Sequence, residues 1–137
     1  MTASEQGFVV VTTTHESEEQ ARALASAVVR ERLAACAQVY PVRSVYWWDG
    51  EVQDAEEWRI DLKTRAELVD RLGAFVAGLH SYGTPELIAV PVTGGSPGYL
   101  AWVAEETVAV ETVAVETAAE ETAAAARAAD RAEQLRE

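Results

Sequence analysis

The dipeptide Asp49-Gly50 constrains the fold more than any other feature, because Asp-Gly between two long runs is the strongest short-range β-hairpin signal. With these residues as a two-residue turn, residues 36–63 form two unusually long strands. Pro41 interrupts the first of them, so we expect an edge strand or a bulge there. The predicted facing pairs are Trp48 with Glu51, Arg43 with Glu56, Val39 with Ile60 and Ala37 with Leu62.

A strand and a helix are expected before this hairpin. Residues 8–14 are β-branched almost throughout, which predicts a strand buried on both faces. Ser17 and Gln20 then form a capping box, and apolar residues recur at helical spacing after it. Leu33 ends that apolar run.

A second helix, a strand and a last helix are expected after the hairpin. Thr64 with Glu67 forms a second capping box, followed by an apolar stripe. Residues 87–92 predict a strand, and Ser96-Pro97 begins the last helix. The order β-α-β-β-α-β plus a C-terminal helix predicts an α+β fold of the ferredoxin-like, split βαβ type. Both main helices then cover one face of the sheet.

The C-terminal extension, residues 107–137, differs from the predicted domain, residues 1–106. Around its start the sequence Glu-Thr-Val-Ala-Val occurs twice, from Glu106 to Val115, and an Ala/Glu/Arg-rich stretch follows. A five-residue step advances about 140° around a helix, so no apolar stripe forms. We expect a solvated extension that is helical or disordered. A coiled-coil partner helix is the alternative, but the segment lacks a heptad.

Charge and cysteine content limit the partners and the compartment. The net charge is −12, from 23 acidic and 11 basic residues, which argues against nucleic acid and anionic membrane partners. Cys36 is the only cysteine, so no intramolecular disulfide can form. The polar start lacks a signal-peptide pattern, and no apolar run approaches the ~18 residues of a membrane span. A cytoplasmic protein is expected.

Motifs for enzyme chemistry are missing from the sequence. It has no phosphate-binding glycine loop, no Cys-x-x-Cys, no His-Glu-x-x-His and no Gly-x-Ser-x-Gly. Only His15 and His80 could supply a neutral imidazole. An enzyme that uses Glu86 or His80 as a general acid or base is one possible function class, but the sequence offers no nucleophile–base pair for it. The prediction is therefore a non-enzymatic protein without an obligatory cofactor.

Half of the chain's aromatic residues lie within residues 36–63: Tyr40, Tyr46, Trp47, Trp48 and Trp58. A long aromatic ribbon at a sheet edge pairs or aggregates unless another surface covers it. Self-association into a closed ring leaves no free edge, so we expect an obligate oligomer. The alternative is that the tip folds back on its own core.

Five separated motifs agree in order and spacing with a known family: Leu33-Ala34-Ala35-Cys36, Tyr46-Trp47-Trp48-Asp49-Gly50-Glu51, Glu57 through Thr64, His80-Ser81-Tyr82-Gly83-Thr84-Pro85-Glu86-Leu87, and Pro91-Val92-Thr93-Gly94 with Tyr99-Leu100-Ala101-Trp102. Over about residues 7–106 the chain resembles the CutA divalent-cation tolerance family. The resemblance implies a trimer closed through the long hairpins, similar in plan to PII signalling proteins. It also implies a cytoplasmic role linked to copper and other divalent metals.

The family's metal-binding residues are only partly present. The resemblance attributes metal binding to a cysteine late in the first strand and to histidines before a Pro-Tyr pair. Here the strand position is Thr13, and the histidine motif reads Leu79-His80-Ser81-Tyr82. His80 and Cys36 are therefore the candidate metal residues, with copper or another divalent cation as the ligand. The alternatives are a polar residue at a helix C-terminus for His80 and a small buried hydrophobe for Cys36.

Six residues of the shared motifs combine aromatic rings with side chains of both charge signs, and together they suggest a ligand cleft between subunits. They are Trp48, Glu57, Lys63, Tyr82, Glu86 and Trp102. The structural alternative is a salt bridge from Lys63 to Glu57 or Glu86, with the aromatic rings as packing. The leading function is a non-enzymatic homotrimer in divalent metal (copper) tolerance. A PII-like small-ligand or metabolite sensor that uses these clefts is the second.

Overall fold

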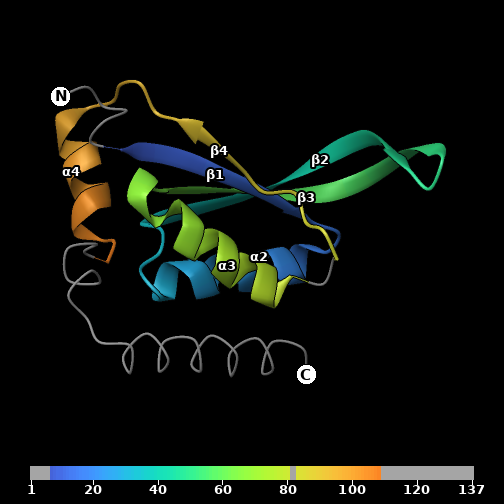
Figure 1. Ribbon diagram of the computed structural model, residues 1–137, viewed down its shortest axis with the longest axis horizontal. Coiled ribbons are helices and arrows are strands. Elements are labelled where there is room, and N and C mark those ends of the chain that lie inside the picture. Colours follow the sequence, from blue (N-terminus) through green and yellow to red (C-terminus); the bar gives the residue numbers. More distant parts are fainter. Residues whose placement is uncertain (1–6, 81–82, 109–137) are drawn as a thin grey trace.

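The computed structural model describes residues 7–80 and 83–108, and these form the predicted order of elements (Figure 1). The elements are β1 (Phe8–His15), α2 (Glu18–Arg30), β2 (Cys36–Trp48), β3 (Glu51–Arg65), a 3₁₀ turn (Ala66–Leu68), α3 (Val69–Leu79), β4 (Ile88–Pro91) and α4 (Pro97–Glu105). The strands make one antiparallel sheet in the order β2-β3-β1-β4. This is the α+β arrangement expected of a split βαβ chain.

Both main helices lie against the same face of the sheet (Figure 1). The core between them is apolar and includes Ile60, Leu62, Leu72 and Val76, each fully buried. We call the opposite side the open face. It is the side on which Thr12, Arg59, Asp61 and Lys63 alternate with the core residues of β1 and β3, because successive strand residues point to opposite faces.

The long hairpin has the predicted register. All four predicted pairs are present, and β2 pairs with β3 without interruption from Cys36 opposite Lys63 to Trp48 opposite Glu51. Asp49 and Gly50 both have positive φ, 53° and 75°, as a type I′ turn requires. Pro41 lies on an edge strand, as predicted, but the alternative of a bulge is wrong, because Pro41 pairs directly with Trp58.

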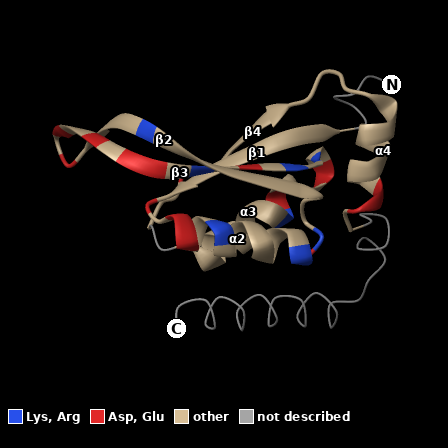
Figure 2. Cartoon of the chain, turned by 180° about the vertical axis from the view of Figure 1, so that it is seen from behind, with Lys and Arg blue, Asp and Glu red and all other residues tan. Residues whose placement is uncertain are grey.

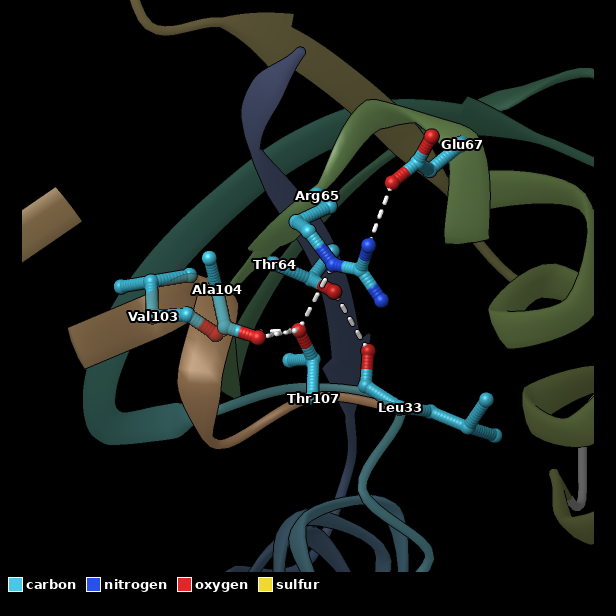
Figure 3. Close-up of polar contacts among 7 residues, drawn as sticks. All are labelled: Leu33, Thr64, Arg65, Glu67, Val103, Ala104 and Thr107. Carbon is cyan, nitrogen blue, oxygen red and sulfur yellow. Dashed lines mark hydrogen bonds and ion pairs between the residues drawn. The ribbon is translucent and has the colours of Figure 1, made fainter. Parts of the chain in front are cut away.

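The first predicted capping box is present in part, since the Ser17 side chain accepts a hydrogen bond from the Gln20 N–H. The second is wrong, because β3 continues through Arg65 before the helical turn begins. Figure 3 shows the reason: the Thr64 hydroxyl donates to the carbonyl of Leu33 at 2.6 Å, and Glu67 pairs with Arg65.

The start of α4 and the extent of β4 also differ in detail from prediction. Ser96 occupies the N-cap of α4, but its side chain caps no backbone N–H; Pro97 is the first helical residue, as expected. β4 is shorter than the predicted strand over residues 87–92 and pairs with the middle of β1.

Contacts with the body continue beyond the end of α4. Arg65 donates from Nε to the Thr107 hydroxyl at 2.9 Å, and that hydroxyl donates in turn to the carbonyls of Val103 and Ala104 (Figure 3). Arg32 forms an ion pair with Glu106, and its carbonyl accepts from the Val108 N–H. The folded contacts therefore reach residue 108. The predicted extension lies outside the described residues from 109 onward, so its helical or disordered state stays a prediction.

Candidate functional site

The two histidines lie together beneath the end of β1. His15 ends that strand, His80 follows the last residue of α3, and their rings stack with centroids 4.5 Å apart. Both are buried, at 3% and 6% exposure. The sequence named His80 as a candidate ligand and did not pair it with His15, because the two are far apart in the chain and only the β1–α3 packing joins them.

The ring nitrogens of this pair are engaged with the backbone. His80 Nε2 lies 2.6 Å from the Thr14 carbonyl oxygen, which can only accept, so this nitrogen carries a proton. His15 Nδ1 accepts from the Glu16 N–H. Burial, and next the neighbouring His80, lower the pKa of His15. The lowered pKa of His15 favours its neutral ring, and the stacked pair joins the end of α3 to β1.

Cys36 does not share this environment. It lies directly opposite Lys63 in the β2–β3 ladder, on the open face, whereas His15 alternates onto the helix-covered face. Thr13, at the strand position of the family's cysteine, is fully buried, and its hydroxyl oxygen has no hydrogen-bond partner among the described residues. Within residues 7–80 and 83–108, no three His, Cys, Asp or Glu side chains gather as metal ligands would.

The six residues of the predicted cleft do not meet within one chain. Trp48 lies at the hairpin tip opposite Glu51, and the twelve strand residues from there to Lys63 span roughly 40 Å. Glu57 is six residues from Lys63, or about 20 Å along the same strand. Tyr82 lies outside the described residues. These distances agree with a cleft placed between subunits, in which the Trp48 of one copy meets the other side chains from a neighbouring copy; that cleft stays a prediction.

Two of the predicted residues do come together, through a third that the sequence did not select for the cleft. Lys63 Nζ lies 5.7 Å from the centre of the Tyr99 ring, and the Tyr99 and Trp102 rings are 5.5 Å apart. Lys63 takes part in none of the ion pairs formed by the described residues. The structural alternative, a salt bridge from Lys63 to Glu57 or Glu86, is therefore not observed in one copy, where Lys63 makes a cation–π contact.

A polar cluster on the open face is the best-defined group of functional side chains. Asp61 accepts hydrogen bonds from Tyr40 at 2.7 Å, Thr12 at 2.9 Å and Arg59 at 3.2 Å. Burial alone would raise the pKa of Asp61, but these bonds outweigh it and hold the pKa below its usual value. The hydrogen bond to Asp61 raises the pKa of Tyr40. The cluster is an ionised, preorganised unit.

Glu86 interacts electrostatically with Arg59 of this cluster, and none of the ion pairs formed by the described residues joins Glu86 to Lys63. The pKa of Arg59 is raised, first by its hydrogen bond to Asp61 and further by nearby charges that include Glu86. The sequence alone could not show that Thr12 of β1 and Tyr40 of β2 converge on Asp61, because that needs the order of three strands.

The outer half of the hairpin extends beyond the other labelled helices and strands (Figure 1). We call residues 44–56 the arm. Its apolar side chains are largely exposed: Val45 68%, Tyr46 40%, Trp47 75%, Trp48 69% and Val52 57%. Figure 2 shows acidic segments along the arm and a basic segment on β2 where the arm begins. The predicted alternative, in which the tip folds back on its own core, is wrong for the single chain.

Comparison with known proteins settles the family. The model of the "CutA1 divalent ion tolerance protein" family matches residues 9–106, from the second residue of β1 to the residue after α4. The chain belongs to the CutA1 divalent ion tolerance family. The resemblance drawn from the sequence motifs is thereby confirmed.

Similar proteins of the family occur in plants and in bacteria, among other organisms. Over 101 residues it is 45% identical to the chloroplastic protein CutA 1 of Oryza sativa, covering 72% of this chain and 56% of the relative. It is 42% identical over 99 residues to the divalent-cation tolerance protein CutA of Thermus thermophilus, covering 72% and 96%. The chain thus spans little more than half the length of the plant relative.

Solved structures of CutA1 proteins share the fold. The structure from Oryza sativa superposes with a TM-score of 0.73 at 40% identity, covering 74% of this chain and 94% of that one. The structure from Thermus thermophilus gives 0.71 at 41% identity, covering 74% and 99%.

The compartment differs among the relatives. The Oryza sativa protein is named chloroplastic, and a structurally similar CutA from Archaeoglobus fulgidus is named periplasmic. No helix in the described part of this chain is both long and apolar enough to cross a membrane. The cytoplasmic location expected from the sequence stays a prediction.

Proposed function

We propose that the protein is a non-enzymatic homotrimer that acts in divalent-cation tolerance, and that its arms join the copies. The observation that carries the proposal is the exposure of the arm, where Trp47 and Trp48 are 75% and 69% exposed. An isolated two-stranded ribbon is marginally stable in water, so an exposed aromatic arm of this length needs a surface to pack against.

The sheet offers the complementary surface. Ile88 and Val90 of β4 are 53% and 52% exposed, and both alternate onto the open face with Val10 and Thr12. β2 also ends the sheet on one side and leaves a long free edge. A ring of copies covers open faces, edges and arms at once, whereas a lone copy leaves all three in water.

We propose further that tolerance does not depend on a tight copper site built from one copy. Copper binds best to sets of thiolate and imidazole ligands, but Cys36 and His80 lie on opposite faces of the sheet. The His80 Nε2 proton is also engaged by the Thr14 carbonyl. Titration with Cu(II) and Zn(II) should therefore give the same affinity for wild type, His80→Ala and Cys36→Ala. Tight binding that either substitution abolishes would contradict this part of the proposal.

A small-ligand sensor is the second candidate, and one observation favours it. Lys63, Tyr99 and Trp102 form a cationic aromatic group at the junction of β3 and α4. In an assembly, the arm of a second copy could bring Trp48 to this group and complete the predicted cleft. Thermal shift against a metabolite panel tests this candidate, because ligand-linked stabilisation grows with ligand concentration over dissociation constant.

The tolerance proposal is tested in cells that lack their own family member. Wild type, His80→Ala and a variant with residues 46–52 replaced by a short Asn-Gly turn are expressed at equal levels under raised copper. Wild type and His80→Ala should restore growth, whereas the shortened arm should not, because it removes the assembly surface. Equal rescue by the shortened variant would refute the link between arm and function.

A further inference from the structure

A cavity of about 410 Å³ lies between α2 and the base of the hairpin, on the helix-covered side of the sheet. Its lining comes from α2 on one side and from β2 and β3 on the other: Glu18, Arg22, Ala25, Ala37, Val39 and Trp58. This is within the size range of small-molecule sites. It is separate from the open-face cluster, because those residues alternate to the other side of the sheet.

The charged and the apolar residues of the cavity lie on different parts of its lining. Positions 18, 22 and 25 share one face of α2, so two charged side chains stand next to a buried alanine. Ala37 and Val39 are half-buried and form an apolar floor from β2. Trp58 is also half-buried and packs against the core. The floor therefore suits an apolar group, and the rim carries one charge of each sign.

Glu18 and Arg22, the two charged residues at the rim, form no ion pair with each other. Glu18 and Arg22 are one helical turn apart, about 6 Å along the axis, a spacing at which opposite charges commonly pair. None of the ion pairs formed by the described residues contains either side chain. A carboxylate and a guanidinium at the rim of one apolar cavity match a ligand that carries an ammonium and a carboxylate on the same carbon atom.

We propose that this cavity binds a free apolar α-amino acid. Its carboxylate pairs with Arg22, its ammonium pairs with Glu18, and its side chain lies on the floor against Trp58. A phosphate or other simple anion would meet repulsion from Glu18, and a neutral apolar molecule would leave both charges unused. Binding at this cavity depends neither on the trimer nor on the metal role.

Calorimetric titration of the full chain with L-leucine and L-phenylalanine tests the proposal. Saturable binding of one ligand per chain is expected for both. N-acetyl-L-leucine lacks the ammonium, isoamylamine lacks the carboxylate and glycine lacks the side chain, so each should bind at least about tenfold more weakly. No saturable heat with either amino acid, or equal binding of N-acetyl-L-leucine, would overturn the proposal.

Variants locate the site. Arg22→Gln and Glu18→Gln should each weaken L-leucine binding by about tenfold or more, because each removes one charge-assisted contact. Arg30→Gln is the matched control, since Arg30 lies in the last turn of the same helix and does not line the cavity. All three positions are exposed, so circular dichroism should show unchanged folding. If Arg22→Gln binds as wild type does, or instead changes the mass of the assembly, the cavity is not this site.

Discussion

Replacing both Trp47 and Trp48 with serine gives a sensitive test of the arm. In a single copy the two side chains are 75% and 69% exposed. Their replacement should therefore change the free energy of unfolding of one copy by no more than about 0.5 kcal/mol, as for other surface substitutions. In an assembly that covers the arms, the same change removes a large apolar contact.

The size of that contact follows from the exposed area. A tryptophan buries roughly 200 Å² when fully covered, so the exposed three quarters of Trp47 amount to about 150 Å². At about 25 cal/mol per Å², covering all of it contributes nearly 4 kcal/mol, and Trp48 contributes a similar amount. If the assembly covers only half of this area, the pair still contributes about 4 kcal/mol per copy, or roughly a thousandfold in affinity.

Sedimentation velocity over a dilution series measures the effect, with urea unfolding of the same samples. The double variant should dissociate at far higher concentration than wild type. Glu51→Gln is the control, because it alters the arm without removing apolar area. If the double variant sediments and unfolds as wild type does at every concentration, the arms contribute nothing to association and the reasoning is refuted.

Three further predictions concern the fold and the open-face cluster. Asp61→Asn should destabilise the protein near neutral pH. Because the folded pKa of Asp61 is depressed, the contribution of its carboxylate to stability is present above the unfolded pKa of about 3.9 and is lost as the pH falls through the folded pKa. Urea unfolding should therefore show that the difference in stability between the variant and wild type shrinks below about pH 4. An unchanged difference at pH 3 would contradict this. Thr64→Val should cost about 1–3 kcal/mol in urea unfolding, because it leaves the buried Leu33 carbonyl without its 2.6 Å partner; a neutral effect would show that the bond contributes little. Gly50→Ala should lower the free energy of unfolding by roughly 1 kcal/mol, since φ at this position is 75°, while Gly78→Ala, in the helix α3 with open space around it, should not.

The hairpin could be predicted from sequence because its determinants are local. Asp49-Gly50 fixes the turn, the turn fixes the register, and every predicted pair follows. The capping box at Thr64 failed for the opposite reason, since the hydroxyl binds the carbonyl of Leu33, thirty-one residues away. Sequence spacing cannot show a partner that only tertiary packing brings into reach.

The candidate sites were harder to predict than the fold. The resemblance implied a cleft between subunits that includes Trp48, Glu57 and Lys63. An extended strand separates its own residues by about 3.3 Å each, so one copy cannot test that cleft and it stays a prediction. The Asp61 cluster was missed because Thr12, Tyr40 and Arg59 come from three strands whose order the residues do not state locally.

The mass of the wild-type assembly in solution tests the central claim most directly. Multi-angle light scattering at micromolar concentration should give a single species close to three times the 14.8 kDa of one chain. A stable species of one-chain mass, still folded at that dilution, would contradict the claim that the arms join three copies.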